Sequence, residues 1–191
     1  MKITKSLLAL FMLLALLLAA GCDGNTNTSK GESPAADKPA ATDKANKSGA
    51  KDSAEKTISL KVYYPDDNGM KLLSETRSIE TKGDKYKAAM ESLLEGPKVK
   101  GEVRVIPAKT KLKSIKVKDG VATVDFSEDL SKRFTGGSTG EEMLVGSIVN
   151  TLTEFSEVKS VQFLVEGKKV DSLSGHMDLS KPVGRMKELL K

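Results

Sequence analysis

The stretch KLKSIKVKDGVATVDFS, Lys111–Ser127, contains the strongest indication of the fold. Two runs with β-branched residues flank the dipeptide Asp119-Gly120, which is typical of a tight turn between antiparallel strands. The second run alternates apolar and polar residues, as a strand with one buried face does. The sequence therefore predicts a β-hairpin in the middle of the folded region.

A helix is expected on each side of this hairpin. Upstream, Asp84 can cap a helix that runs to about Glu95, and the following Gly-Pro pair is the usual sequence after a helix end. Downstream, a helix is expected from about Gly140 to Phe155, with apolar residues at helical spacing along one side. At its start, Ser138 with Glu141, or Thr139 with Glu142, can form a capping box.

Further strands are expected at both ends of the folded region. TISLKVYYPD (57–66) alternates like a half-buried strand, and DDNG (66–69) follows as a turn that favours a two-residue hairpin. A less regular strand is expected across 70–79. After the second helix, SVQFLVEG and KKV (160–170) predict a strand and a short return strand, and the polar tail beyond them can form one turn of helix.

The expected order of elements, β-β-α-β-β-α-β-β, has no strict βαβ repetition. This order favours an α+β fold: a single domain of residues 57–191 with one mixed β-sheet and both helices packed on one face. Those residues contain nearly all the large apolar residues of the mature chain, enough for one ordinary core.

The 34 residues before this domain have a different composition. Residues 23–56 contain no large apolar side chain and balanced acids and bases, together with many small polar residues. Such a segment has nothing to bury, so residues 22–56 are predicted to be a disordered linker that begins at Cys22.

The N-terminus has the pattern of a secretory signal. Lys2 and Lys5 precede an apolar run over 7–20, and small residues follow it. The alternative, a transmembrane anchor, needs roughly 20 apolar residues, more than this run contains. LAAGC (18–22) resembles the lipobox of bacterial lipoproteins, although the usual leucine three residues before the cysteine is replaced by alanine. The resemblance implies a signal peptide over residues 1–21, cleavage between Gly21 and Cys22, and diacylglyceryl attachment to Cys22, which anchors the protein in the membrane.

Composition and motifs argue against several classes of function. Net charge is +5 with acids and bases interspersed, and eight aromatic residues are present, so the dense basic stripe and stacking aromatics of a nucleic-acid binder are lacking. DDNG lacks the full spacing of a calcium loop. TGGSTGEE lacks a phosphate-binding motif and reads better as a helix-capping loop than as an anion site.

No catalytic constellation is evident. His176 is the single histidine and is expected in a surface turn, because one imidazole with Ser174 and Asp178 close in sequence does not make a triad. Asp125, in the alternating run after Gly120, is expected to point into solvent. No catalytic residue, metal site or cofactor is predicted, and no ligand-binding residue can be assigned.

Six stretches together resemble the GerMN domain, a module of sporulation and spore-germination lipoproteins. They occur in the family's order between Ile58 and Arg185: VYYPD, LLEGP, VKDGVATVDFS, GSTGEEM, IVNTLTEFSEVKSVQFLVEGKKV and DLSKPVGR. The resemblance implies a small non-catalytic α/β interaction module on the outer face of the cytoplasmic membrane. It further implies roles in sporulation, germination or envelope remodelling, an envelope protein or cell-wall partner, and self-association. A two-domain member of the family exists, whereas this chain has room for one domain. A peptidoglycan hydrolase and a solute-binding lipoprotein remain as alternatives.

Overall fold

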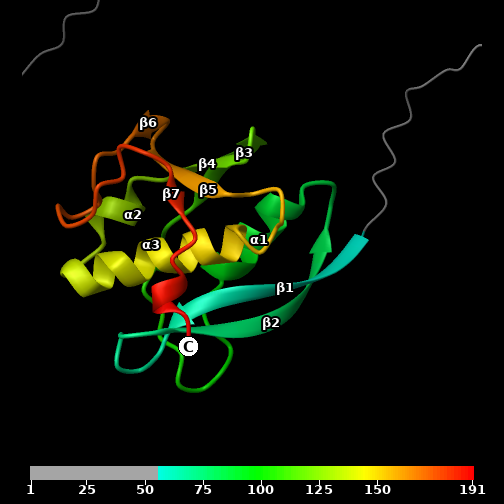
Figure 1. Ribbon diagram of the computed structural model, residues 1–191, viewed down its shortest axis with the longest axis horizontal. Coiled ribbons are helices and arrows are strands. Elements are labelled where there is room, and N and C mark those ends of the chain that lie inside the picture. Colours follow the sequence, from blue (N-terminus) through cyan, green and yellow to red (C-terminus); the bar gives the residue numbers. More distant parts are fainter. Residues whose placement is uncertain (1–55) are drawn as a thin grey trace, which may run out of the picture. The chain divides into compact units, whose positions relative to one another are not determined.

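The Asp119-Gly120 hairpin is present in the computed structural model, which describes residues 56–191 (Figure 1). Strand β3 (Leu112–Lys118) pairs antiparallel with β4 (Val121–Phe126). Asp119 and Gly120 have φ angles of 51° and 80°, as a two-residue turn with positive φ at both positions requires. The predicted signal peptide, the lipidation site and the linker up to residue 55 lie outside the described residues.

The hairpin strands β3 and β4 belong to a five-stranded sheet. Strand β5 (Ser160–Val165) pairs parallel with β4, and the chain between them passes through α2 (Asp129–Lys132) and α3 (Ser138–Leu152). This detour is necessary because parallel neighbours need a crossover. The predicted return strand is β6 (Lys168–Lys169), which pairs with β5. Strand β7 (Val183–Gly184) also pairs with β5, and neither β7 nor α2 was expected from sequence.

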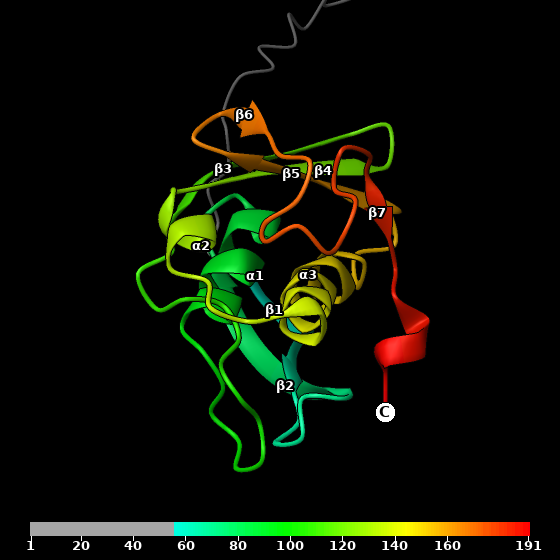
Figure 2. The same cartoon turned by 90° about the vertical axis from the view of Figure 1, so that its left-hand side faces the viewer.

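Strands β1 (Lys56–Pro65) and β2 (Leu72–Thr81) form a separate two-stranded sheet. The α+β class is confirmed, but the prediction of one mixed sheet is wrong, because the strands divide into two sheets with α1 and α3 between them (Figure 2). The reason lies in α3, where eleven of fifteen residues are buried. A helix whose residues are buried on all sides needs cover on all sides, so one sheet on one face is not enough.

The first predicted helix is confirmed as α1 (Lys85–Leu94). The carboxylate of Asp84 accepts hydrogen bonds from the backbone N–H groups of Tyr86 and Lys87, at 3.0 Å each. Gly96, just after the helix, has a φ of +93°, which a side chain would make unfavourable. Helix α1 packs against α3 and both sheets, with its apolar residues Ala89, Met90 and Leu93 buried.

The predicted capping box at the start of α3 is wrong. The helix begins one turn earlier than Glu141, with Gly137 as its N-cap and no side-chain hydrogen bond there. Glu141 is instead fully buried and turned toward a loop that follows β6. The carboxylate finds more donors in that loop than the single N–H that a capping box offers.

The turn between β1 and β2 is wider than the predicted two-residue turn. The backbone N–H of Asp66 donates to the carbonyl oxygen of Lys71 at 2.8 Å, which leaves four residues in the loop. The carboxylate of Asp66 accepts the N–H of Met70 at 2.9 Å, so it organises this wider loop. The tail ends in the expected single turn of helix, a 3₁₀ turn η1 (Lys187–Leu189). Within residues 56–191, no helix has the length and hydropathy to cross a membrane.

Candidate functional site

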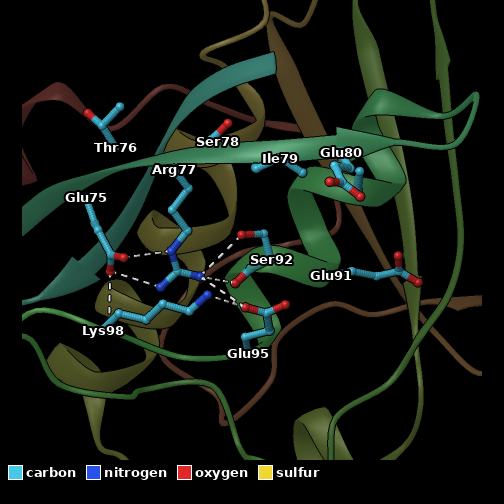
Figure 3. A pocket seen from close by; sticks show the side chains of 11 residues that line it. Glu75, Thr76, Arg77, Ser78, Ile79, Glu80, Glu91, Ser92, Glu95 and Lys98 are labelled. Carbon is cyan, nitrogen blue, oxygen red and sulfur yellow. Dashed lines mark hydrogen bonds and ion pairs between the residues drawn. The ribbon is translucent and has the colours of Figure 1, made fainter. Parts of the chain in front are cut away.

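A groove of about 570 Å³ runs along β2, between this strand and α1 (Figure 3). On one side it is lined by six consecutive residues of β2, Glu75–Glu80. Neighbouring side chains of a strand point to opposite faces of the sheet, so a groove lined by six in succession must lie along the edge of the strand. The opposite wall is formed by Ala88, Glu91, Ser92 and Glu95, with Lys98 beyond the helix.

Arg77 forms the floor of this groove. Its guanidinium binds the carboxylate of Glu75 with two parallel hydrogen bonds, Nε to Oε1 at 2.8 Å and Nη2 to Oε2 at 2.9 Å. It also donates to the carbonyl oxygens of Ser92 and Gly96, at the C-terminal end of α1. Because all three nitrogens already donate to protein acceptors, Arg77 joins β2 to α1 and has little capacity left for an anionic ligand.

Two carboxyl groups interact next to Arg77. The hydrogen bonds from Arg77 lower the pKa of Glu75. Burial and the negative charge of Glu75 raise the pKa of Glu102 to about 7. Oε2 of Glu102 is buried, and no hydrogen-bond partner for it exists within residues 56–191. Near neutral pH Glu75 is therefore the charged member of the pair, and Glu102 is partly protonated.

The rim of the groove is acidic. Glu80 and Glu91 are exposed, and Glu95 lies 2.8 Å from Lys98 between Oε2 and Nζ. With the Glu75–Arg77 pair neutral as a unit, the remaining ionisable residues of the lining are these three carboxylates and one lysine. The lining therefore has a net negative charge and favours cationic groups, while Glu91 also pairs with Lys87 of α1, 3.7 Å away between Oε1 and Nζ.

A second groove, with a larger volume of about 810 Å³, lies beside the N-terminal half of β1. Its lining includes Ile58 and Leu60 from β1, Ile115 and Val117 from β3, and Phe155. Lys85 and Tyr86 lie at this groove, and both donate hydrogen bonds to Oε1 of Glu157. Those bonds lower the pKa of Glu157 to about 2, so this rim is held by an ion pair.

The other residues considered from sequence do not come together in either groove. His176 is exposed in a loop, as predicted, and its backbone N–H donates to the carboxylate of Glu141 at 2.9 Å. Asp125 was expected in solvent, and that expectation is wrong. Its side chain is buried and accepts the N–H of Gly167 at 2.8 Å, because the turn between β5 and β6 folds over it.

Of the remaining sequence motifs, one stabilises a turn and the other lies outside residues 56–191. The DDNG turn holds its own loop through Asp66, and residues 56–191 contain no group of three His, Cys, Asp or Glu side chains placed to bind a metal. Gly21 and Cys22, the predicted cleavage and lipidation site, are outside the described residues.

Sequence reasoning missed the charged cluster of Glu75, Arg77 and Glu102. One signal was present: Glu75 and Arg77 alternate with exposed residues and share the inward face of β2 with Ile79. Two opposite charges at inward positions of a strand indicate a buried ion pair. Glu102 could not be assigned to the same cluster, because its position depends on the long loop after α1.

Comparison with known proteins identifies the family. Residues 61–171 match the family model Germane, described as sporulation and spore germination. The chain belongs to this family. The Germane chain is 29% identical over 127 residues to the spore germination protein GerM of Bacillus subtilis (strain 168), a match over 64% of this chain. It spans only 34% of the length of GerM.

Solved structures agree with this assignment of the Germane chain. The first GerMN domain of the sporulation protein GerM from Bacillus subtilis superposes with a TM-score of 0.58 at 26% identity, covering 68% of this chain and 98% of that domain. A candidate lipoprotein from Clostridium perfringens superposes with a TM-score of 0.50 at 28% identity, covering 69% of this chain and 89% of that one. The Germane chain is therefore similar to sporulation-related proteins over its folded part.

Proposed function

We propose that this Germane protein is a lipid-anchored, non-catalytic interaction protein of the cell envelope. Its lipid is attached at Cys22, its place is the outer face of the cytoplasmic membrane, and it acts in sporulation, spore germination or envelope remodelling. The lipobox-like LAAGC sequence and the similarity to GerM and to the candidate lipoprotein of Clostridium perfringens support the anchor and the process.

The hydrogen bonds of Arg77 are the observation that supports a non-catalytic role. Catalytic groups need free donors or acceptors aimed at the reacting atoms. The charged groups at the floor of the groove instead bond to one another and to the end of α1. This arrangement gives a rigid wall for binding a partner, either an envelope protein or a wall polymer.

The anchor is tested with Cys22→Ala in cells supplied with a labelled fatty acid. We expect the wild-type chain to be labelled and shortened, and the variant to remain unlabelled and uncleaved, because only a thiol forms the thioether. Cys22 is the only cysteine in the chain, so the variant removes no other thiol. Labelling or processing that is unaffected by the substitution contradicts the proposed anchor.

A peptidoglycan hydrolase is the second candidate, and the Glu75–Glu102 pair is the observation in its favour. A carboxyl group with a pKa of about 7 beside a charged carboxylate is a plausible general acid. The carboxyl groups of glycoside hydrolases are about 5 Å or more apart, however, which leaves space for the sugar between them. Here both carboxylate oxygens of Glu75 accept hydrogen bonds from Arg77, so this carboxylate is not free to act on a sugar and suits a structural role better.

Digestion of purified peptidoglycan separates the two candidates. We expect no release of fragments by the wild-type protein. Activity that is present in the wild-type protein and lost in Glu102→Gln, or in alanine variants of the exposed carboxylates and His176, overturns the non-catalytic proposal.

A further inference from the structure

Within residues 56–191, the edge of β2 that faces the groove has backbone groups without hydrogen-bond partners. The N–H of Tyr63 on β1 donates to Oγ1 of Thr151, away from β2, so Tyr63 and its partner Ser74 are not hydrogen-bonded to each other. Antiparallel pairs alternate between bonded and non-bonded, so Thr76, Ser78 and Glu80 also direct their N–H and C=O groups outward. Within residues 56–191, no hydrogen bond to the backbone groups of these four residues comes from outside the β1–β2 sheet.

One end of this edge already holds an extended segment. The carbonyl oxygen of Leu72, at the start of β2, accepts the N–H of Lys191 at 3.3 Å, and Leu72 forms a parallel β-bridge with Leu190. Residues 190 and 191 therefore pair with β2 at its first residue, Leu72. From Ser74 to Glu80 the strand is exposed at alternate positions, next to the groove.

The two sheets differ in how their edges are protected. Natural proteins commonly place lysines on exposed edge strands to prevent pairing with other chains. The outer strand of the larger sheet, β3, has Lys113, Lys116 and Lys118 within seven residues. Strand β2 has no lysine, proline or register shift in ten residues. Its inward charges, Glu75 and Arg77, are paired with each other and leave no free charge to oppose a new strand.

The charge of the groove specifies the kind of segment that fits. Glu80, Glu91 and Glu95 flank the open edge, and Lys98 is the one cation among the exposed side chains of the lining. A strand added to β2 lies about 4.8 Å from it, so its side chains reach this rim. Lysine side chains complement these carboxylates, whereas acidic side chains are repelled.

We propose that the open edge of β2, from Ser74 to Glu80, binds an extended, lysine-containing segment of another polypeptide by strand addition. Backbone hydrogen bonds supply affinity in this mode of recognition, and the rim selects the side chains. The inference deepens the proposed interaction role and rests on it for its physiological meaning. The pairing itself depends only on the described strand and groove.

The test measures binding of a fluorescent peptide to the full-length chain in non-ionic detergent micelles. The probe is a blocked seven-residue peptide of alternating lysine and valine, and anisotropy reports its affinity. Ser78→Pro removes an outward N–H without touching the bonds to β1, and we expect at least a tenfold loss of affinity. Ser59→Pro is the matched control, because Ser59 lies directly opposite on β1 and its N–H points to the other edge. We expect that variant to bind the peptide like the wild type.

Two further comparisons separate strand addition from plain charge attraction. A version of the probe methylated on alternate backbone nitrogens keeps its lysines but cannot pair, and we expect its binding to be lost. The double variant Glu80→Gln, Glu91→Gln is expected to weaken the unmethylated probe about two- to tenfold, as two exposed charge pairs would. Hydrogen exchange of the complex is expected to show new protection in residues 74–80.

Several outcomes overturn the proposal. These are equal effects of the two proline variants, undiminished binding of the methylated probe, or no protection in β2. Self-association of the chain that Ser78→Pro abolishes would show that the occupant is a second copy. The anchor is tested separately. If Cys22 is not acylated but Ser78→Pro still loses probe binding, the proposed location is contradicted and the proposed strand addition is supported.

Discussion

Glu141 is fully buried near the start of α3, and its carboxylate accepts five hydrogen bonds from one loop. The donors are the backbone N–H groups of Leu173, Ser174 and His176 and the hydroxyls of Ser172 and Ser174, at 2.7–3.1 Å. Burial alone would raise the pKa of this carboxyl, but these bonds outweigh it and lower the pKa to about 2. Glu141 therefore holds the loop after β6 onto α3.

Replacement of Glu141 by glutamine should destabilise the protein by about 2–3 kcal/mol at neutral pH, because an amide places donors against donors. The lowered pKa gives stability that is present above about pH 4.5 and is lost as the pH falls toward 2. Between pH 7 and pH 3 we expect the wild-type free energy of unfolding to fall by about 2 kcal/mol more than that of the variant, because most of this linkage is lost above pH 3. Urea unfolding at pH 7 and pH 3 measures both effects.

Glu142→Gln is the control for this prediction. Glu142 is the next residue on α3 and is partly exposed, so the change should be within about 0.5 kcal/mol of neutral. Equal losses in the two variants would contradict the role assigned to Glu141.

At the scale of elements, α3 depends on a close contact with the C-terminal segment. A Cβ atom at Gly146 would lie 2.6 Å from Cδ1 of Leu189 and 3.1 Å from Cδ1 of Leu72. Asn150, one turn later, donates from Nδ2 to the carbonyl oxygen of Met186 at 3.0 Å and accepts the N–H of Met186 at 2.9 Å. The tail thus lies against a flat patch on α3 that glycine provides.

Gly146→Ala should therefore destabilise the protein despite the higher helix propensity of alanine. Overpacking costs about 1–3 kcal/mol, and the propensity gain is about 1 kcal/mol. In a Leu189→Ala background the nearest clashing atom is gone, so the same substitution should become nearly neutral or stabilising. Thermal unfolding of the wild type, Gly146→Ala, Leu189→Ala and the double variant gives the interaction energy between the two positions. Strict additivity of the two single effects would contradict the contact.

Helices are also the elements that local sequence describes best. Asp84 and Gly96 at the ends of α1, and the turn at Asp119-Gly120, act within a few residues, so their roles could be predicted. The start of α3 could not, because Glu141 had two sets of donors to choose from. The loop that it binds lies more than thirty residues away in the sequence.

At the scale of the whole folded part, α3 is the common core of two sheets. Leu144, Ile148 and Leu152 are fully buried, and the helix contacts β1 and β2 on one side and β5 on the other. The two sheets share no edge, so their stability depends on the helices between them.

Ile148→Ala should lower the free energy of unfolding by about 2–5 kcal/mol and reduce amide protection in both sheets together. Hydrogen exchange followed by mass spectrometry can compare β2 with β4. Ile115→Ala, on the partly exposed β3, is the control and should cost clearly less. Protection that is lost in one sheet and kept in the other would show that the sheets are separate folding units.

The sequence by itself determined the Asp119-Gly120 hairpin, helix α1, the approximate position of α3, the α+β class and the family resemblance, because alternation, helical spacing, caps and turns are local properties. It also determined the expectation of a lipid at Cys22, which rests on the residues around it. Only the tertiary structure decided that the strands form two sheets around α3, that Glu75 and Arg77 meet Glu102, and that the outer edge of β2 is unpaired from Ser74 to Glu80 within residues 56–191, beside an acidic groove. These features depend on which surfaces pack together across long separations, and burial on every side of α3 decides that packing.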